Sequence, residues 1–244
     1  MHKLFLIGGG WNESSFPLTQ GRFIEAIPSS GRKILVIAAS PTKTDSTRLR
    51  EHCDVFVSLG LFPDELVPLH LTPEEPLTLK QLEEIQPTGI FVCGGLTPAY
   101  QEALCKNRDW LEYLKRTNIP YAGFSAGSAI AASDAIVGGW QLTIDGRLVP
   151  ILDEELAEDL DAVDVRPGLG FVPFSIDVHA SQWGTISRLM HAIDQGMVKN
   201  GWAIDEDTML EINGDAITVH GLGQTYFIEG KSPGRISLEI HRAE

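Results

Sequence analysis

Five short, almost continuously apolar segments alternate with stretches of helical periodicity through the first half of the chain. The apolar segments are residues 3–7, 33–39, 66–69, 89–93 and 120–124. The stretches between them predict helices over residues 21–27, 47–59, 79–85 and 98–117, the last with a break near Asn107. Strands that are apolar on both faces and separated by helices are typical of a parallel sheet covered on both sides. We therefore expect an α/β fold.

Small residues gather where several of these strands end. Three examples are Gly8-Gly9-Gly10, Ala38-Ala39-Ser40 and Cys93-Gly94-Gly95. Ligands of parallel α/β sheets bind at the carboxyl ends of the strands. We expect these segments to meet in one crevice.

A serine between two glycines, Gly123-Phe124-Ser125-Ala126-Gly127, follows the fifth apolar segment and precedes a small-residue helix. This pattern is typical of a nucleophile elbow, in which the serine is exposed on a sharp turn and the next amide faces an oxyanion. The same glycines also suit a strand-to-helix turn that only allows close packing. The motif alone does not choose between these interpretations.

Bulk composition narrows the class of protein. The chain has 244 residues, 43% of them hydrophobic, and we expect one domain over residues 1–244. Its formal net charge of -14 argues against binding to nucleic acid or to an anionic membrane. The apolar run at the amino terminus is too short for a membrane span or a signal peptide. Three cysteines without metal-binding spacing favour a reducing cytoplasm.

A serine nucleophile needs a base and an acid that orients the base. His179 follows an apolar strand and precedes a helix that begins near Thr185, so it is the preferred base over His70 and His220. For the acid, strand alternation after Trp202 places Glu206 on the apolar side. If that side faces inward, Glu206 is the buried acid, and Asp205 and Asp207 are solvated or cap a turn.

Gly94-Gly95 is the fourth element of this constellation. A backbone amide in this turn can pair with the Ala126 amide to form an oxyanion hole, although the two glycines also suit a tight turn before a helix at Pro98.

Farther along, residues 138–146 predict a hairpin or surface excursion and residues 202–240 predict antiparallel strands that finish the sheet. We interpret the acidic run 153–161 as a solvated helix or loop, and the alternative is a mobile lid over the crevice.

Together these residues resemble the S51 serine peptidases, the group of dipeptidase E and cyanophycinase. The resemblance covers the glycine pair, the elbow, Ile176-Asp177-Val178-His179 with Ser181-Gln182, and the segment 201–208. It implies Ser125 as nucleophile, His179 as general base, Glu206 as its orienting acid, and Gly95 and Ala126 as oxyanion donors. It also implies a flavodoxin-like three-layer α/β/α sandwich similar to class I glutamine amidotransferases, without a metal or organic cofactor.

The resemblance implies less about substrate specificity than about the reaction. The resemblance implies substrate contacts from five residues: Gly94, Thr97, Asp177, Gln182 and Arg188. However, Leu96-Thr97 stands where cyanophycinases have Asp-Gln and dipeptidase E has Asn-Thr, and Val178 and Trp183 replace a glutamine and an arginine of cyanophycinases. We expect a short or isopeptide-linked peptide as substrate and leave a homodimer open.

Three other functions are weighed against the peptidase. An amidotransferase-type amidase would carry cysteine at position 125 and usually glutamate at 181, where serines stand. A non-catalytic binding or regulatory protein agrees with the missing substrate-contacting residues. Dinucleotide binding through Gly8-Gly9-Gly10 is excluded because the spacing differs from the Rossmann fingerprint.

Overall fold

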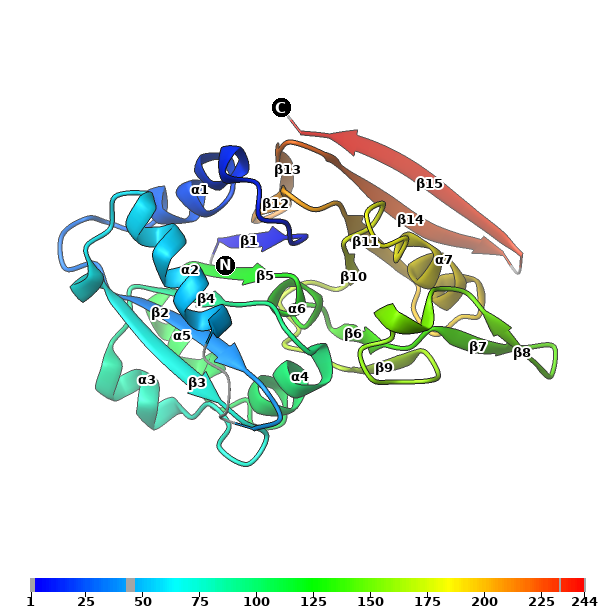
Figure 1. Cartoon of the computed structure of the whole chain (residues 1–244), viewed down its shortest axis with the longest axis horizontal. Helices are drawn as coiled ribbons and strands as arrows, with labels where there is room; N and C mark the ends of the chain where they lie inside the picture. The colour runs from blue at the N-terminus through cyan, green and yellow to red at the C-terminus, as the bar shows by residue number, and fades with distance from the viewer. Residues whose placement is uncertain (1–2, 43–46, 233, 244) are drawn as a thin grey trace.

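A computed structural model describes residues 3–42, 47–232 and 234–243. Its central sheet has seven strands in the order β13-β12-β1-β5-β4-β2-β3, and five of them run parallel (Figure 1). These strands are β1 (Leu4–Ile7), β2 (Ile34–Ala39), β3 (Leu66–Leu71), β4 (Gly89–Val92), β5 (Tyr121–Phe124), β12 (Thr208–Asn213) and β13 (Ala216–Gly221). The prediction of a mostly parallel sheet is confirmed.

Helices cover both faces of this sheet (Figure 1). They are α1 (Gln20–Glu25), α2 (Thr47–Ser58), α3 (Leu79–Ile85), α4 (Thr97–Cys105), α5 (Leu111–Thr117), α6 (Ala126–Ala129) and α7 (Ile186–Asp194). Phe23 of α1 and Phe56 of α2 contact Phe91 of β4. The next residue of β4, Val92, points to the opposite face, where its carbonyl lies against Gly127 of α6. The three-layer arrangement follows from strands that are apolar on both faces.

The tail corrects one prediction. Strand β12 extends the central sheet antiparallel to β1, and β13 pairs antiparallel with β12, as expected. A second sheet of order β10-β11-β14-β15 takes up the remaining strands, with bounds β10 (Ser175–Val178), β11 (Asn200–Ile204), β14 (Gln224–Ser232) and β15 (Arg235–Arg242). Helix α7 packs on it around a separate apolar cluster that includes Leu189 and Ile228. Alternation along the chain predicts strands, but it does not say which sheet they join.

Two small antiparallel pairs project beside the second sheet. β6 (Asp134–Gly138) pairs with β9 (Asp164–Pro167), and β7 (Gln141–Ile144) pairs with β8 (Arg147–Pro150). The hairpin predicted at 138–146 is therefore present, shifted by a few residues. Between β8 and β9 runs the acidic segment, which contains a short 3-10 helix, Glu154–Leu156.

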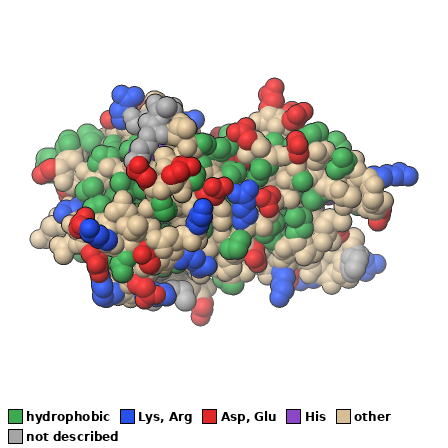
Figure 2. Space-filling model, turned by 90° about the horizontal axis from the view of Figure 1, so that it is seen from below, with side chains coloured by type: hydrophobic (Ala, Val, Ile, Leu, Met, Phe, Trp, Pro, Cys, Tyr) green, Lys and Arg blue, Asp and Glu red, His purple; other side chains and the backbone are tan. Residues whose placement is uncertain are grey.

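Charged side chains of both signs share the surface (Figure 2), and none of the three cysteines forms a disulfide. Figure 2 shows acidic and basic side chains interspersed over the face that it presents, without a continuous basic area. Among the described residues, no helix combines the length and apolarity needed to cross a bilayer. Cys53, Cys93 and Cys105 are free thiols.

Candidate active site

Ser125 lies on a strained turn at the end of β5. Its backbone angles, φ 50° and ψ −109°, lie outside the regions that L-residues ordinarily adopt. The neighbouring glycines are required by packing, because a Cβ on Gly123 would lie 2.4 Å from the Gly127 backbone and one on Gly127 would lie 2.3 Å from the Val92 carbonyl. The turn thus has both the close packing and the strained serine that the two interpretations of the motif predict.

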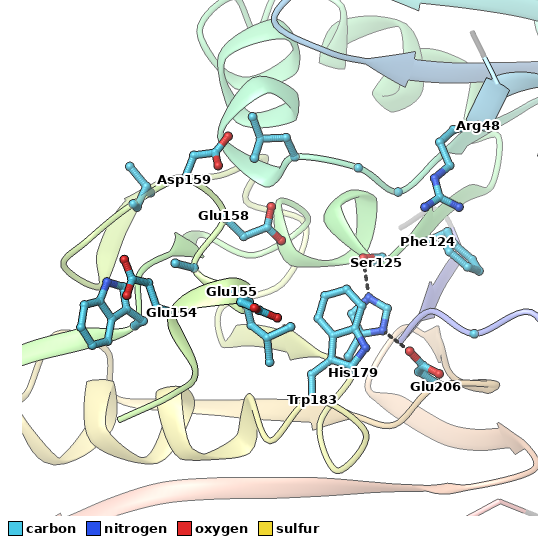
Figure 3. Close-up of a pocket in the computed structure, with 18 of the residues that line it drawn as sticks. Arg48, Phe124, Ser125, Glu154, Glu155, Glu158, Asp159, His179, Trp183 and Glu206 are labelled. Atoms are coloured by element: carbon cyan, nitrogen blue, oxygen red, sulfur yellow. Dashed lines mark hydrogen bonds and ion pairs between the residues drawn. The ribbon is translucent and has the colours of Figure 1, made fainter. Parts of the chain in front are cut away.

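The structure brings His179 and Glu206 to this serine (Figure 3). Ser125 Oγ lies 2.9 Å from His179 Nε2, and His179 Nδ1 lies 2.7 Å from Glu206 Oε1. His179 follows the last residue of β10, and its amide donates to the carbonyl of Gly8 at 3.0 Å. This bond fastens the end of the second sheet to the end of β1, which is how residues from two sheets meet. The rival histidines lie elsewhere, His70 beside Ser40 and His220 beside Glu211.

The amino-terminal glycine triplet makes room for this assembly. Gly9 has φ +110°, and a Cβ there would lie 2.2 Å from Cε1 of His179. A Cβ on Gly8 would meet the Asp205 carbonyl at 2.2 Å, and one on Gly10 would meet Asp207 Oδ1 at 2.5 Å. The triplet is therefore the surface against which His179 and the loop that carries Glu206 pack.

The loop after β11 corrects the expectation about the three acids. Glu206 contacts His179, but its side chain is 26% exposed, whereas Asp205 is 3% exposed and accepts from the amide and hydroxyl of Ser181. Strand alternation fails here because β11 ends at Ile204. The hydrogen bond with His179 holds the pKa of Glu206 below its usual value, against the opposing effect of burial. Glu206 is therefore a carboxylate at neutral pH.

Trp183 supports the imidazole from its open face. The indole is stacked on the His179 ring, with centroids 3.7 Å apart and planes at 6°. A side-chain hydrogen bond from Trp183 also helps to hold the Glu206 pKa down. Because the ring is confined between Gly9 and Trp183, the imidazole has one packed orientation, with its two nitrogens facing Ser125 and Glu206.

These groups open into a pocket of about 840 Å³. Gly94 and Gly95 line it next to the serine, since a Cβ on Gly94 would lie 3.1 Å from Ser125 Cβ. Tyr100 donates to the Gly94 carbonyl at 2.7 Å and fixes the turn. Within the described chain, neither the Gly95 amide nor the Ala126 amide has a hydrogen-bond partner. Of the strand ends expected to share the crevice, 38–40 is not among the described lining residues.

The acidic segment forms one wall of the pocket. We call residues 154–161 the acidic strap. Its Glu158 side chain is largely buried and accepts from the Thr97 amide at 2.9 Å and the Thr97 hydroxyl at 3.1 Å. Burial raises the pKa of Glu158, and the bonds with Thr97 oppose that effect. The default expectation of a solvated run holds for Glu154, Glu155 and Asp159, which are exposed, but not for Glu158.

Four of the residues expected to contact substrate are engaged with protein groups. Arg188 makes a bidentate pair with Asp177 at 2.7 and 2.9 Å, and both are almost completely buried. Gln182 Oε1 accepts from the Glu206 amide at 2.9 Å, and Thr97 is held by Glu158. None of the four is among the described residues that line the pocket, whereas Gly94 is. A positioning role agrees better with these bonds than direct substrate contact does.

Several pocket residues have no sequence signal that reveals their place. Arg48, His52 and Trp11 reach the pocket from α2 and the loop after β1, and none of them belongs to a recognisable motif. His52 is 1% exposed, and burial lowers its pKa to about 3, so its ring is neutral. Among the described residues, no group of three or more His, Cys, Asp or Glu side chains is arranged to hold a metal ion.

Comparison with known proteins decides the family. The model of peptidase family S51 matches residues 4–220, which is most of the chain. The chain belongs to peptidase family S51. Its activity class is therefore that of a peptidase, a hydrolase of peptide bonds.

Solved structures share the fold of this S51 peptidase at low sequence identity. A peptidase from an acI-B1 Actinobacterium superposes with a TM-score of 0.67 at 15% identity, over 100% of this chain and 95% of the other. A putative peptidase E protein from Listeria monocytogenes EGD-e superposes with a TM-score of 0.54 at 18% identity, over 91% and 99% of the two chains.

Proposed function

We propose that this S51 peptidase hydrolyses short peptides by acyl transfer, with Ser125 as the nucleophile, His179 as the general base and Glu206 as the orienting acid. The observation that carries this proposal is the hydrogen-bonded series from Ser125 Oγ through both imidazole nitrogens to Glu206, at 2.9 and 2.7 Å, on the wall of the 840 Å³ pocket. A serine on a strained elbow with a base and an acid in series is the arrangement used for acyl transfer on several folds.

The proton balance of the reaction follows from this geometry. Ser125 Oγ attacks the scissile carbonyl while His179 Nε2 takes the hydroxyl proton, and Glu206 stabilises the imidazolium through Nδ1. His179 then gives the proton to the leaving amine as the C–N bond breaks, which leaves an ester on Ser125. A water molecule, deprotonated by His179, attacks the ester, and the proton returns to Ser125 as the acid product leaves.

The tetrahedral oxyanion needs donors that are free before substrate binds. Gly95 and Ala126 supply such amides in our proposal, because both belong to turns that adjoin Ser125 and neither amide is used within the described chain. An oxyanion donor contributes about 3 to 4 kcal/mol to transition-state stabilisation. Tyr100 keeps the Gly94 carbonyl turned away through its hydrogen bond, and so it supports the orientation of the following amide.

The size of the pocket supports a short substrate. A volume of about 840 Å³ is suited to a few residues rather than to a folded chain. The structural likeness to a putative peptidase E protein agrees with a dipeptidase or other exopeptidase. Isopeptide-linked substrates, as in cyanophycinases, are the second class to include in a screen.

The proposal is tested with Ser125→Ala and a library of dipeptides, β-linked peptides and longer peptides. We expect turnover of the best substrate to be abolished with the melting temperature preserved, and a serine-reactive phosphonate to label wild-type protein once, at Ser125. Ser58→Ala removes a hydroxyl on α2 that does not line this pocket, and it should retain both activities. Undiminished hydrolysis by Ser125→Ala would refute the proposal, as would a wild-type protein that the phosphonate does not label at any pH.

A further inference from the structure

The pocket is strongly unequal in charge from one side to the other. Arg48 is the single Lys or Arg among the described lining residues, whereas six carboxylates line the same space: Glu154, Glu155, Glu158, Asp159, Asp161 and Glu206. Figure 3 shows Arg48 and Phe124 on one side of Ser125 and the labelled acids of the strap on the other. A substrate lying across Ser125 therefore meets the carboxylates of the strap at only one of its two ends (Figure 3).

The acidic strap is fixed to the body of the protein. Gly139 donates to the Ala157 carbonyl at 2.8 Å, and Trp140 donates to the Asp161 carbonyl at 3.1 Å. Gly138 leaves room for Glu158, since a Cβ on Gly138 would lie 2.7 Å from Glu158 Cβ. Together with the bonds from Glu158 to Thr97, these contacts hold the strap as a wall of the pocket at a defined distance from Ser125.

The carboxylates of the pocket divide into engaged and unengaged groups. Glu158 is occupied by Thr97, and Glu206 is occupied by His179. The side chains of Glu154, Glu155, Asp159 and Asp161 make no hydrogen bond or ion pair with any described residue, and each lines the pocket. Adjacent carboxylates repel one another, and a cation placed among them removes that repulsion and gains attraction from each.

The side of the pocket near Arg48 and Phe124 has no unengaged carboxylate among its described lining residues that could pair with a cation. The His52 ring is buried and neutral, neither of its nitrogens has a hydrogen-bond partner among the residues that the structure describes, and it packs against Trp11 and Phe124. Arg48 lies over the Trp11 ring at 5.9 Å, and its guanidinium also pairs with Glu51 at 3.3 Å, which offsets its charge. This side suits the uncharged parts of a ligand, whereas the strap side attracts cations, so the uneven distribution of free carboxylates orients a charged peptide.

From this polarity we infer that the pocket selects short peptides carrying a positive charge on the strap side of the scissile bond, with Glu154, Glu155 and Asp159 as specificity-determining residues. The inference rests on the proposed function, because it takes Ser125 as the point at which the substrate is cut. An ion pair with a partly exposed carboxylate changes binding by about threefold, and three such groups acting together change it by about tenfold or more. The effect weakens as salt is added.

The test compares matched peptides that differ only in charge. A short scaffold carries Lys, the uncharged isostere norleucine, or Glu on either side of the scissile bond, and kcat/KM is measured for wild-type protein and for Glu154→Gln/Glu155→Gln/Asp159→Asn. At one of the two positions we expect wild-type protein to prefer Lys over norleucine by about tenfold or more. The triple variant should lose most of that ratio while its kcat/KM for norleucine stays within about twofold. Glu84→Gln neutralises an exposed carboxylate on α3 outside the pocket and should leave the ratio unchanged.

The controls separate this inference from the proposed function. Phosphonate labelling of Ser125 measures the nucleophile without a charged substrate, and it should proceed equally in wild-type protein and the triple variant. If Ser125 is labelled but the Lys-to-norleucine ratio of wild-type protein is near one, the charge selection is overturned and the proposed function stands. The same conclusion follows if the triple variant keeps the wild-type ratio. Absence of labelling would overturn the proposed function. Added sodium chloride should reduce the ratio in wild-type protein and leave it unchanged in the triple variant.

Discussion

Gly9→Ala should strongly reduce peptide hydrolysis, because Gly9 confines the imidazole ring of His179. An alanine Cβ at this position would lie 2.2 Å from Cε1 of His179, whereas ordinary contact begins near 3.4 Å. The ring or the backbone must therefore move by about 1.2 Å, and Trp183 stacked on the other face blocks the simplest displacement. A misplacement of about 1 Å in a catalytic assembly costs about 10²-fold in rate. We expect kcat/KM to fall by at least that factor.

A second glycine separates this effect from backbone strain. Gly9 has φ +110°, which costs an L-residue about 1 to 3 kcal/mol in stability whatever surrounds it. Gly60 has φ +95°, and no described atom lies within 4 Å of the point that a Cβ would occupy there, so Gly60→Ala carries the strain without the clash. Gly9→Ala should lose at least as much stability as Gly60→Ala in urea unfolding, because it adds the clash to the strain, and only Gly9→Ala should lose peptide hydrolysis and phosphonate labelling. Equal activity in the two variants would show that Gly9 does not confine the imidazole.

Three further predictions concern the surroundings of the imidazole. Trp183→Ala should lower kcat about three- to tenfold by removing the stacked ring from His179, whereas Trp183→Phe should restore most of the loss in the same assay. Asp177→Asn should lower the free energy of unfolding by about 3 to 5 kcal/mol because it removes the carboxylate that pairs with the buried Arg188, and a loss below about 1 kcal/mol in urea unfolding would contradict this. Because the folded-state pKa of Glu206 lies below its usual 4.5, the stability that Glu206 contributes is fully present above that pH and is lost as pH falls through the folded-state pKa. Wild-type protein and Glu206→Gln should therefore differ more in unfolding at about pH 6 than at about pH 3, and the reverse order would refute the assignment.

Much of the fold was predictable because its signals are local. Continuous apolar runs such as Ile34–Ala39 can be buried on both faces only in a covered sheet, and the helices between them supply the cover. The cap formed by Thr78 and Gln81 starts α3 at the predicted residue. The second sheet was not predictable in this way, since the partners of β10 and β14 depend on contacts between distant segments.

In the candidate site, too, local patterns were predictable from the sequence and contacts between distant segments were not. The elbow at Ser125 and the strand-end position of His179 are local patterns, so the sequence indicates a serine and its base. The acid is different, because Glu206 lies beyond the end of β11, where alternation no longer applies, and its orientation depends on Gln182 and Asp205. The role of Gly9 depends on a ring 170 positions away in the chain.

The sequence by itself determined the α/β class, the serine elbow and the resemblance to S51 peptidases, because apolar periodicity and glycine spacing act over a few residues. Only the tertiary structure decided that Trp183 and Gly9 enclose the imidazole, that Asp177 and Arg188 pair with each other, and that the acidic strap faces Ser125. The physical reason is that contact distances and unpaired charges are properties of segments brought together from distant parts of the chain.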